Sequence, residues 1–276
     1  MRFPRLLASL LASLVVLAAL FFAACGGGGG SDAPTRVKVL VIHKGTDAQG
    51  LADVLAALAA TGKFTGSSFD AGASPSPGGA ALAAFDAALV LGDGSFADGV
   101  TLGNDLSTYV DGGGALVLAM WLFRGANTPV PNFPEGLGGV YDVGGYFAIP
   151  ESATNLDSPN TCTGGPMGSL PLTVPAPTHP ILAGGALSGG LGVVPAFNAA
   201  SLSGLTLCKH HDGIAIAGGA TLVAAWDDGA PFVATNLIGF AHARTVNLGA
   251  DVQELATSPA TFQVVANALL WACGRL

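Results

Sequence analysis

Charged side chains are scarce in this chain. Only 10% of its 276 residues are Asp, Glu, Lys or Arg, against about a quarter in an average soluble domain. The 10 basic and 18 acidic residues leave a net charge of −8. A surface that is acidic overall repels phosphates and anionic lipid headgroups, so we expect no nucleic-acid partner.

Long apolar runs are also scarce, although 50% of the residues are hydrophobic and the mean hydropathy is +0.57. The only stretch long enough to enter a bilayer spans residues 6–24. Elsewhere the apolar runs are short and end at one of the 41 glycines. Runs of that kind are typical of buried strands and of helices that face a core.

The amino terminus has the layout of an export signal. Arg2 and Arg5 precede the apolar run, and Ala23 and Ala24 supply small residues before a cleavage point. The segment "FFAAC", residues 21–25, resembles the lipobox of bacterial lipoproteins, although leucine is usual at the position of Phe22. The resemblance implies that Cys25 is acylated and binds the lipid bilayer. The alternatives are an ordinary signal peptide or an uncleaved anchor, with Cys25 incidental.

The five glycines that follow Cys25 predict a flexible tether. The segment "GGGGGSDAPT" cannot pack a core and would let a head stand about 15–20 Å from the lipid surface. In lipoproteins an aspartate directly after the cysteine marks retention in the inner membrane, and here Gly26 favours the outer membrane. We therefore predict a signal peptide over residues 1–24, a lipidated cysteine and tether over 25–35, and a head over 36–276 in the cell envelope.

Three cysteines remain after the tether. Cys273 falls on the apolar face of a predicted helix and is expected to be buried. Export implies an oxidising compartment, so we predict a disulfide between Cys162 and Cys208, which would contribute about 4 kcal/mol. Free thiols and the other two pairings remain open.

Short apolar runs alternate with amphipathic segments along the head, which predicts right-handed crossovers and a parallel sheet covered on both faces. The expected fold class is α/β, a three-layer sandwich with a mostly parallel, flavodoxin-like sheet, a long loop-rich insertion at about 123–178 and a β-hairpin. The predicted strands are 36–43, 64–69, 85–92, 115–120 and 244–249, the hairpin is 221–236, and helices are centred on 51–58, 102–110 and 262–273.

The order of these elements resembles the class I glutamine amidotransferase-like fold, and in particular its ThuA-like branch. The segments that carry the resemblance are "FDAALVLGDG", "DLSTYVDGGGALVLAM", "THPILAGG", "LVAAWDDGAPFVATN" and "FQVVANALLWACG". Active amidotransferases place a nucleophilic cysteine at a sharp turn after a strand. The matching turn here holds Met120 and Trp121, or else Asp93 and Ser95, and a thioether cannot form a thiolate. The resemblance therefore implies the fold and argues against that reaction.

Three residues are candidates for other chemistry. His43 follows a predicted strand and, with Asp93 at the next strand end, would act as a base with its orienting acid. The alternative for this pair is a histidine at a strand end and a turn aspartate. His179 in "THPIL" matches a recurring element of the ThuA-like branch, and Pro180 holds it extended, which favours a structural role.

The segment "CKHHDG", residues 208–213, gathers ligand types for a metal. On a strand His210 and His211 would point to opposite faces, so they share a metal only if the segment is a loop. A zinc site needs three or four ligands, and the spacing does not supply the others. The alternative is a polar turn before a strand, and we expect no cofactor.

Two functions are compatible with these features. The first is a non-catalytic, membrane-tethered head that binds a small ligand, a glycan or an envelope protein. The second is a ThuA-like enzyme that acts on sugars or other small molecules, with or without the help of a metal, through His43, Asp93 or His179. Convergence of polar side chains in a cleft at the strand ends would favour the enzyme.

Overall fold

The computed structural model describes residues 35–45, 48–92, 95–119, 122, 136–150, 173–188, 191–202, 215–226, 229–239 and 243–276. All of them belong to one compact unit, Pro34–Leu276. The predicted signal peptide and Cys25 lie outside the described residues. None of the helices in the described ranges is long and apolar enough to cross a membrane.

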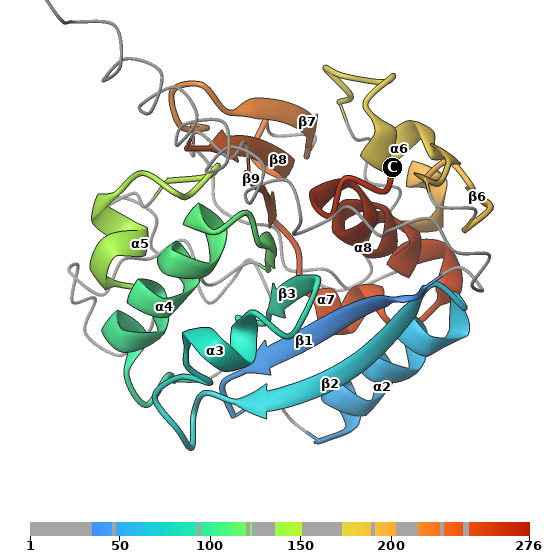
Figure 1. Cartoon of the computed structure of the whole chain (residues 1–276). Coiled ribbons are helices and arrows are strands. Elements are labelled where there is room, and N and C mark those ends of the chain that lie inside the picture. The colour runs from blue at the N-terminus through green and yellow to red at the C-terminus, as the bar shows by residue number, and fades with distance from the viewer. Residues whose placement is uncertain are drawn as a thin grey trace, which may run out of the picture. The chain divides into compact units, whose positions relative to one another are not determined.

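A seven-stranded sheet organises this unit, with the strand order β2-β1-β3-β4-β9-β8-β7 (Figure 1). From β2 to β9 neighbouring strands run parallel, whereas β8 is antiparallel to β9 and β7 is antiparallel to β8. The order 2-1-3-4 followed by a fifth parallel strand is the flavodoxin-like order. The strands are β1 (Val37–His43), β2 (Phe64–Asp70), β3 (Ala87–Val90), β4 (Ala115–Leu118), β7 (Thr221–Ala225), β8 (Pro231–Ile238) and β9 (Ala243–Leu248).

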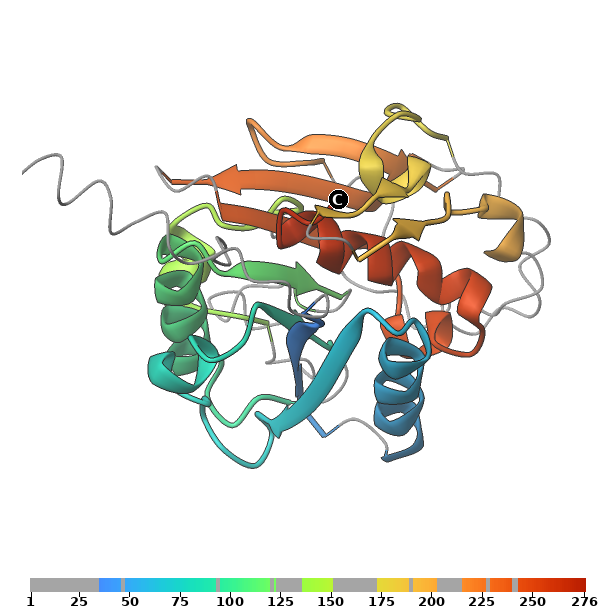
Figure 2. The ribbon, with the colours of Figure 1, turned by 45° about the vertical axis from the view of Figure 1, so that its right-hand side comes forward.

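Helices cover both faces of the sheet and make a three-layer α/β sandwich, as the sequence predicts (Figure 2). One face packs against α2 (Ala48–Ala60), α7 (Val252–Leu255) and α8 (Pro259–Ala272), and the other against α3 (Gly79–Leu82), α4 (Gly99–Asp111) and α5 (Gly139–Val143). The remaining elements are α6 (Pro180–Ala183), the 3-10 helix η3 (Ala199–Leu202) and a two-stranded sheet of β5 (Gly185–Ala186) and β6 (Val193–Val194).

Residue alternation along β1 explains why the strand has no polar face. Val39 and Val41 pack on the α2 and α8 side, and Leu40 and Ile42 pack on the α4 side. A strand buried on both faces reads as a continuous apolar run, which is how the sequence presents it.

Helix α8 follows its sequence signals closely. Ser258 caps its first turn by accepting a hydrogen bond from the Thr261 N–H at 3.3 Å, and Pro259 occupies the first helical position. Gly274 follows the helix with φ of 66°, in the left-handed region that glycine favours. Cys273 is buried, as its place on the apolar face predicts.

A glycine seam joins α4 to the segment that leads into α5. Gly138 N donates to Gly99 O at 3.1 Å, and a Cβ at Gly103 would collide with the Gly138 carbonyl oxygen. The Asn104 side chain fastens the same segment by accepting from Val140 N at 2.8 Å. Only glycine at 103 allows the two backbones to approach this closely.

Part of the predicted insertion belongs to the core. Tyr141, Phe147 and Ile149 are buried against α4 and the sheet, within the range 123–178 that composition assigns to a loop-rich insertion. The glycines around them read as loop signals, but they serve the close backbone contact at α4. Composition therefore does not predict the burial of these residues or the short helix α5 beside them.

Candidate functional site

The carboxyl edge of the parallel sheet contains the point where strand order reverses. The chain places β2 on one side of β1 and β3 on the other, so β1 and β3 end beside each other at this point. Leu91 N donates to Ile42 O at 2.8 Å, which continues the pairing to the strand ends. Ligands of open α/β sheets bind beyond this point, and His43 and Lys44 stand there.

His43 is buried at this edge with an unsatisfied ring nitrogen. Its side chain is 9% exposed, and among the described residues its Nδ1 has no hydrogen-bond partner. By strand alternation it lies on the face of Val39 and Val41. Asp93, its predicted partner, lies outside the described residues, so the pairing of the two stays a prediction.

Lys44 is buried beside an aromatic ring. Its side chain is 1% exposed, and its Nζ lies 4.5 Å from the centroid of the Phe96 ring. A cation over an aromatic face gains electrostatic energy, more so when both groups are desolvated. Phe96 packs with the cluster on the α4 side, so Lys44 and His43 serve opposite faces of the sheet.

Three loops are bonded to one another around these residues. Ala71 N donates to His43 O at 2.7 Å, and Ala97 N donates to Ala71 O at 2.8 Å. The Asp70 carboxylate accepts from Gly72 N at 2.9 Å and from Ala73 N at 3.1 Å, which closes the turn after β2. Asp70 therefore shapes the edge, and it is engaged with backbone rather than with His43.

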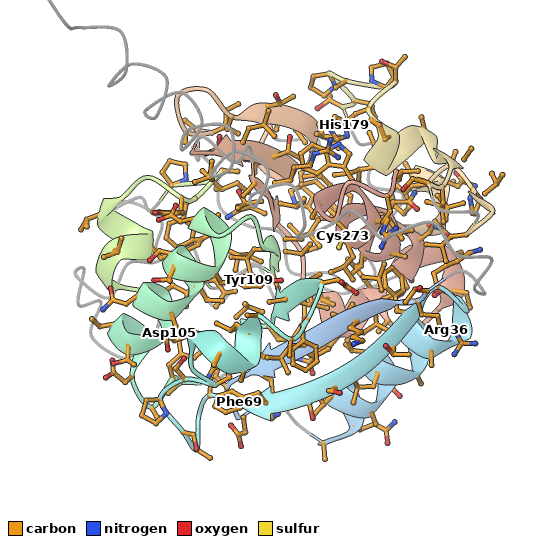
Figure 3. The ribbon with its side chains drawn as sticks, viewed as in Figure 1. Arg36, Phe69, Asp105, Tyr109, His179 and Cys273 are labelled. Carbon is orange, nitrogen blue, oxygen red and sulfur yellow. The ribbon has the colours of Figure 1, made fainter. Side chains whose placement is uncertain are left out.

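His179 lies in a different environment, at the start of α6 (Figure 3). Its Nδ1 accepts a hydrogen bond from Ile181 N at 3.3 Å, and its ring lies 5.1 Å from that of Trp271. The Arg244 guanidinium lies 5.0 Å from the same indole, and its Nη1 donates to Trp271 O at 2.8 Å. Burial lowers the pKa of His179, and the nearby charge of Arg244 lowers it further.

The two candidate histidines belong to opposite edges of the sheet. His179 lies close to Arg244, which is the second residue of β9, whereas His43 is the last residue of β1. Because β1 and β9 run in the same direction, the start of one and the end of the other lie at opposite edges. The fold therefore does not bring them together in one site. The geometry gives His179 the structural role of a helix cap.

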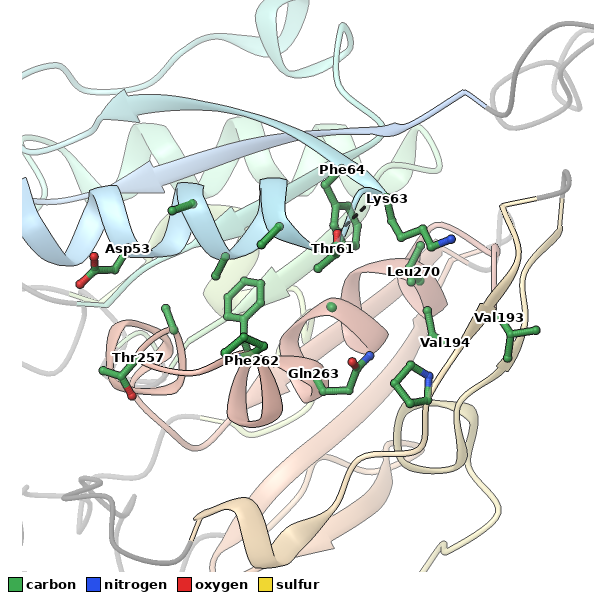
Figure 4. A pocket seen from close by; sticks show the side chains of 17 residues that line it. Asp53, Thr61, Lys63, Phe64, Val193, Val194, Thr257, Phe262, Gln263 and Leu270 are labelled. Atoms are coloured by element: carbon green, nitrogen blue, oxygen red, sulfur yellow. Dashed lines mark hydrogen bonds between the residues drawn. The ribbon is translucent and has the colours of Figure 1, made fainter.

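A groove of about 600 Å³ runs between α2, α8 and β6 (Figure 4). Its walls are mostly apolar and include Ala57, Ala60, Phe64, Val194, Phe262 and Leu270, while Asp53 and Lys63 lie toward opposite ends. Lys63 Nζ donates to the Leu191 carbonyl oxygen, and Gln263 Nε2 donates to Asn267 Oδ1 at 2.8 Å. Sequence reasoning did not find this groove, because its walls come from three segments far apart in the chain. The one local signal is the row of small alanines on α2, which leaves room beside the helix.

The metal candidates cannot be placed. His210 and His211, like Cys162, Cys208, Met120 and Trp121, lie outside the described residues. Within the described ranges, no group of three His, Cys, Asp or Glu side chains could hold a metal ion. The predicted disulfide and the metal alternative both stay predictions.

The fold defines the class of this protein as a flavodoxin-like α/β sandwich. No family model matches the chain, and no curated protein matches it. Among solved structures it is similar to a ThuA-like protein from Bacteroides uniformis, with 15% sequence identity, a TM-score of 0.49, and coverage of 90% of this chain and 95% of that one. The fold class rests on this chain's own strand order and not on that likeness, and membership of the ThuA-like branch stays a prediction.

Proposed function

We propose that this chain is a lipid-anchored envelope protein whose α/β head binds a small, mainly apolar ligand without transforming it. The observation that carries the proposal is the groove between α2 and α8. Its volume of about 600 Å³ lies within the range of about 300–1,000 Å³ that small-molecule sites occupy. Apolar walls with a few polar groups at the ends are also typical of such sites.

The charges at the ends of the groove favour one ligand orientation. Lys63 Nζ has three N–H donors, and its hydrogen bond to Leu191 O uses one of them. A ligand with an acceptor or anionic group at one end would place that group at Lys63. The carboxylate of Asp53, toward the other end, would repel the same group.

The anchoring part of the proposal rests on the sequence. Arg2 and Arg5, the apolar run and "FFAAC" have the order of a lipoprotein signal, and neither candidate nucleophile turn carries a cysteine. The variant Cys25→Ser should abolish lipid labelling of the protein, because it removes the thiol that would carry the lipid. Globomycin, which blocks cleavage of the signal peptide, should instead leave a labelled precursor of higher mass. Labelling that persists in Cys25→Ser would refute the anchor.

The groove can be tested with 1-anilinonaphthalene-8-sulfonate, which joins apolar rings to an anionic sulfonate. The variant Ala60→Trp should fill the groove and weaken binding of the probe about tenfold or more, because the ring would occupy the apolar space. The matched control is Ala59→Trp, on an exposed neighbour in α2 that does not line the groove. Equal probe binding by both variants would refute the groove as the ligand site.

His43 supports the second candidate, an enzyme at the carboxyl edge. A buried imidazole nitrogen at the strand-order reversal that has no hydrogen-bond partner among the described residues could bond a substrate. The variant His43→Gln should abolish turnover in a screen of sugars and small polar substrates if this candidate is right. Ala60→Trp would leave such turnover unchanged, which separates the two candidates.

A further inference from the structure

The basic residues of this acidic protein gather at one edge of the sheet. Five of the six Lys and Arg side chains in the described ranges lie at the amino edge, where the parallel strands begin. These five are Arg36 just before β1, Lys38 as the second residue of β1, Lys63 just before β2, Arg244 at the start of β9 and Arg275 after α8. Only Lys44 stands at the carboxyl edge, and it is buried.

Contacts across the edge show that these residues are neighbours. Val37 N donates to Lys63 O at 2.9 Å, which joins the starts of β1 and β2. Lys38 N donates to Asp86 Oδ2 at 2.8 Å, and Cys273 Sγ contacts Asp86 O at 3.5 Å. A Cβ at Gly274 would lie 4.0 Å from Arg244 Nη1. The cations therefore follow one continuous edge from β2 to β9.

Few carboxylates oppose them there. Asp86 accepts the Lys38 N–H, and Asp111, at the end of α4, accepts from the Tyr146 hydroxyl at 2.8 Å. At the carboxyl edge carboxylates outnumber cations, and they include Asp70, Asp98 and Asp251. Hydrogen bonds from Thr101 lower the pKa of Asp98.

Support of helix ends explains only part of this distribution. Arg244 donates to Trp271 O in the last turn of α8, and Lys63 donates to Leu191 O, so both have structural partners. Arg36 and Lys38, by contrast, are exposed on the strand that begins the fold. Positive charge at these positions needs another explanation.

We propose that this amino edge is a membrane-facing surface that binds anionic phospholipid headgroups. The proposal rests on the lipid anchor proposed above, because the chain enters the fold at Arg36 directly after the tether. The tether predicted from the sequence would span about 15–20 Å, which is short enough to bring the edge where the chain enters the fold within reach of the bilayer. Cations within a Debye length of an anionic leaflet, about 10 Å at moderate salt, are attracted to it. The carboxyl edge with His43 then faces away from the lipid.

Hydrogen exchange of the full chain in vesicles tests this surface. Vesicles of phosphatidylcholine with one quarter phosphatidylglycerol should slow exchange at residues 36–38, 63–64 and 274–276 about threefold or more relative to phosphatidylcholine alone. Residues 70–74 at the other edge should not change. The difference should vanish in high salt, because screening removes the attraction.

A pair of triple variants separates charge from shape. Arg36→Gln, Lys38→Gln and Arg275→Gln together should abolish the slowing, while Arg36→Lys, Lys38→Arg and Arg275→Lys together should keep it. Both sets spare Lys63 and Arg244, which the fold uses. Equal exchange in the two lipid mixtures, or slowing that survives the Gln variants, would overturn the proposal. Lipid labelling of Cys25 reports on the anchor separately, so an unlabelled chain that still shows the slowing refutes the anchor and leaves the surface.

Discussion

Two buried asparagines differ in how fully their side chains are hydrogen-bonded. Asn267, on α8, donates from Nδ2 to Ile181 O at 2.9 Å and to Pro195 O at 3.2 Å, and its Oδ1 accepts from Gln263. Asn247, near the carboxyl end of β9, accepts from Ala148 N at 3.1 Å, but its Nδ2 has no partner among the described residues. Both side chains are fully buried.

The same contrast holds for the histidines. His179 at the amino edge uses its Nδ1 to cap α6, while Nδ1 of His43 at the carboxyl edge has no hydrogen-bond partner in the described ranges. Buried polar groups are nearly always hydrogen-bonded, because an unmet one costs stability. The side chains of Asn267 and His179 therefore maintain the fold through their hydrogen bonds, whereas His43 Nδ1 and Asn247 Nδ2 have no such bond among the described residues.

Asn267→Ala should cause the largest loss in this comparison. The substitution leaves the carbonyls of Ile181 and Pro195 without their donor, which we expect to lower the free energy of unfolding by about 2–3 kcal/mol. Urea denaturation measures the change. The control Gln263→Ala removes one half-buried hydrogen bond and should cost less than about 1 kcal/mol. Equal losses in the two variants would contradict the assigned role of Asn267.

Arg244→Met should have the next largest effect. Losing the hydrogen bond to Trp271 O should lower the free energy of unfolding by about 1–2 kcal/mol. It should also raise the pKa of His179, because a neighbouring positive charge is removed. NMR titration of the imidazole measures that rise, and Arg244→Lys should show less of it. An unchanged pKa of His179 in Arg244→Met would contradict the proposed influence of the Arg244 charge on the imidazole.

The lowered pKa of His179 also sets a pH dependence. The unfolded chain takes up the proton more readily than the folded one, so the stabilisation is complete above about pH 6.5 and is lost as the pH falls. Protonation also removes the acceptor that caps α6. Denaturation midpoints measured across this range should fall less in Arg244→Met than in the parent chain.

Ser258→Ala tests whether location or hydrogen bonding decides stability. Ser258 caps α8 at the carboxyl edge, and its loss should cost about 1 kcal/mol. Ser258→Asp, which keeps a capping oxygen, should retain most of the stability. If Ser258→Ala left the free energy of unfolding unchanged, the carboxyl edge would tolerate the loss of hydrogen-bonded polar groups as well as of unsatisfied ones.

His43→Leu should have the smallest effect on stability, within about 0.5 kcal/mol of the parent or slightly stabilising. An apolar side chain of similar size removes a buried polar atom that has no hydrogen-bond partner in the part of the chain that the structure describes. Thermal denaturation followed by circular dichroism measures the shift. A loss above about 2 kcal/mol would show that His43 supports the fold, as the amino-edge residues do.

Local signals made much of the fold predictable. The apolar run at 36–43 predicts β1, and Ser258 with Pro259 predicts the start of α8, because each signal acts within one element. The alternation of elements predicts the mostly parallel sheet, and the hairpin at 221–236 appears as β7 and β8.

The candidate sites were less predictable, because long-range contacts decide them. His179 meets Trp271 and Arg244 across large separations in sequence, and no local pattern announces that contact. The groove likewise needs α2, α8 and β6 to meet. The burial of Tyr141 depends on a glycine seam whose composition resembles a loop.

The glycine seam on α4 also restricts how the sequence of this protein can change. A Cβ at Gly99 would lie 2.6 Å from the Gly136 carbonyl oxygen, and one at Gly103 would lie still closer to the Gly138 carbonyl oxygen. A side chain at either position would push residues 136–140 away from the helix. Descendants of this chain should therefore keep both glycines even where the exposed residues of α4 diverge.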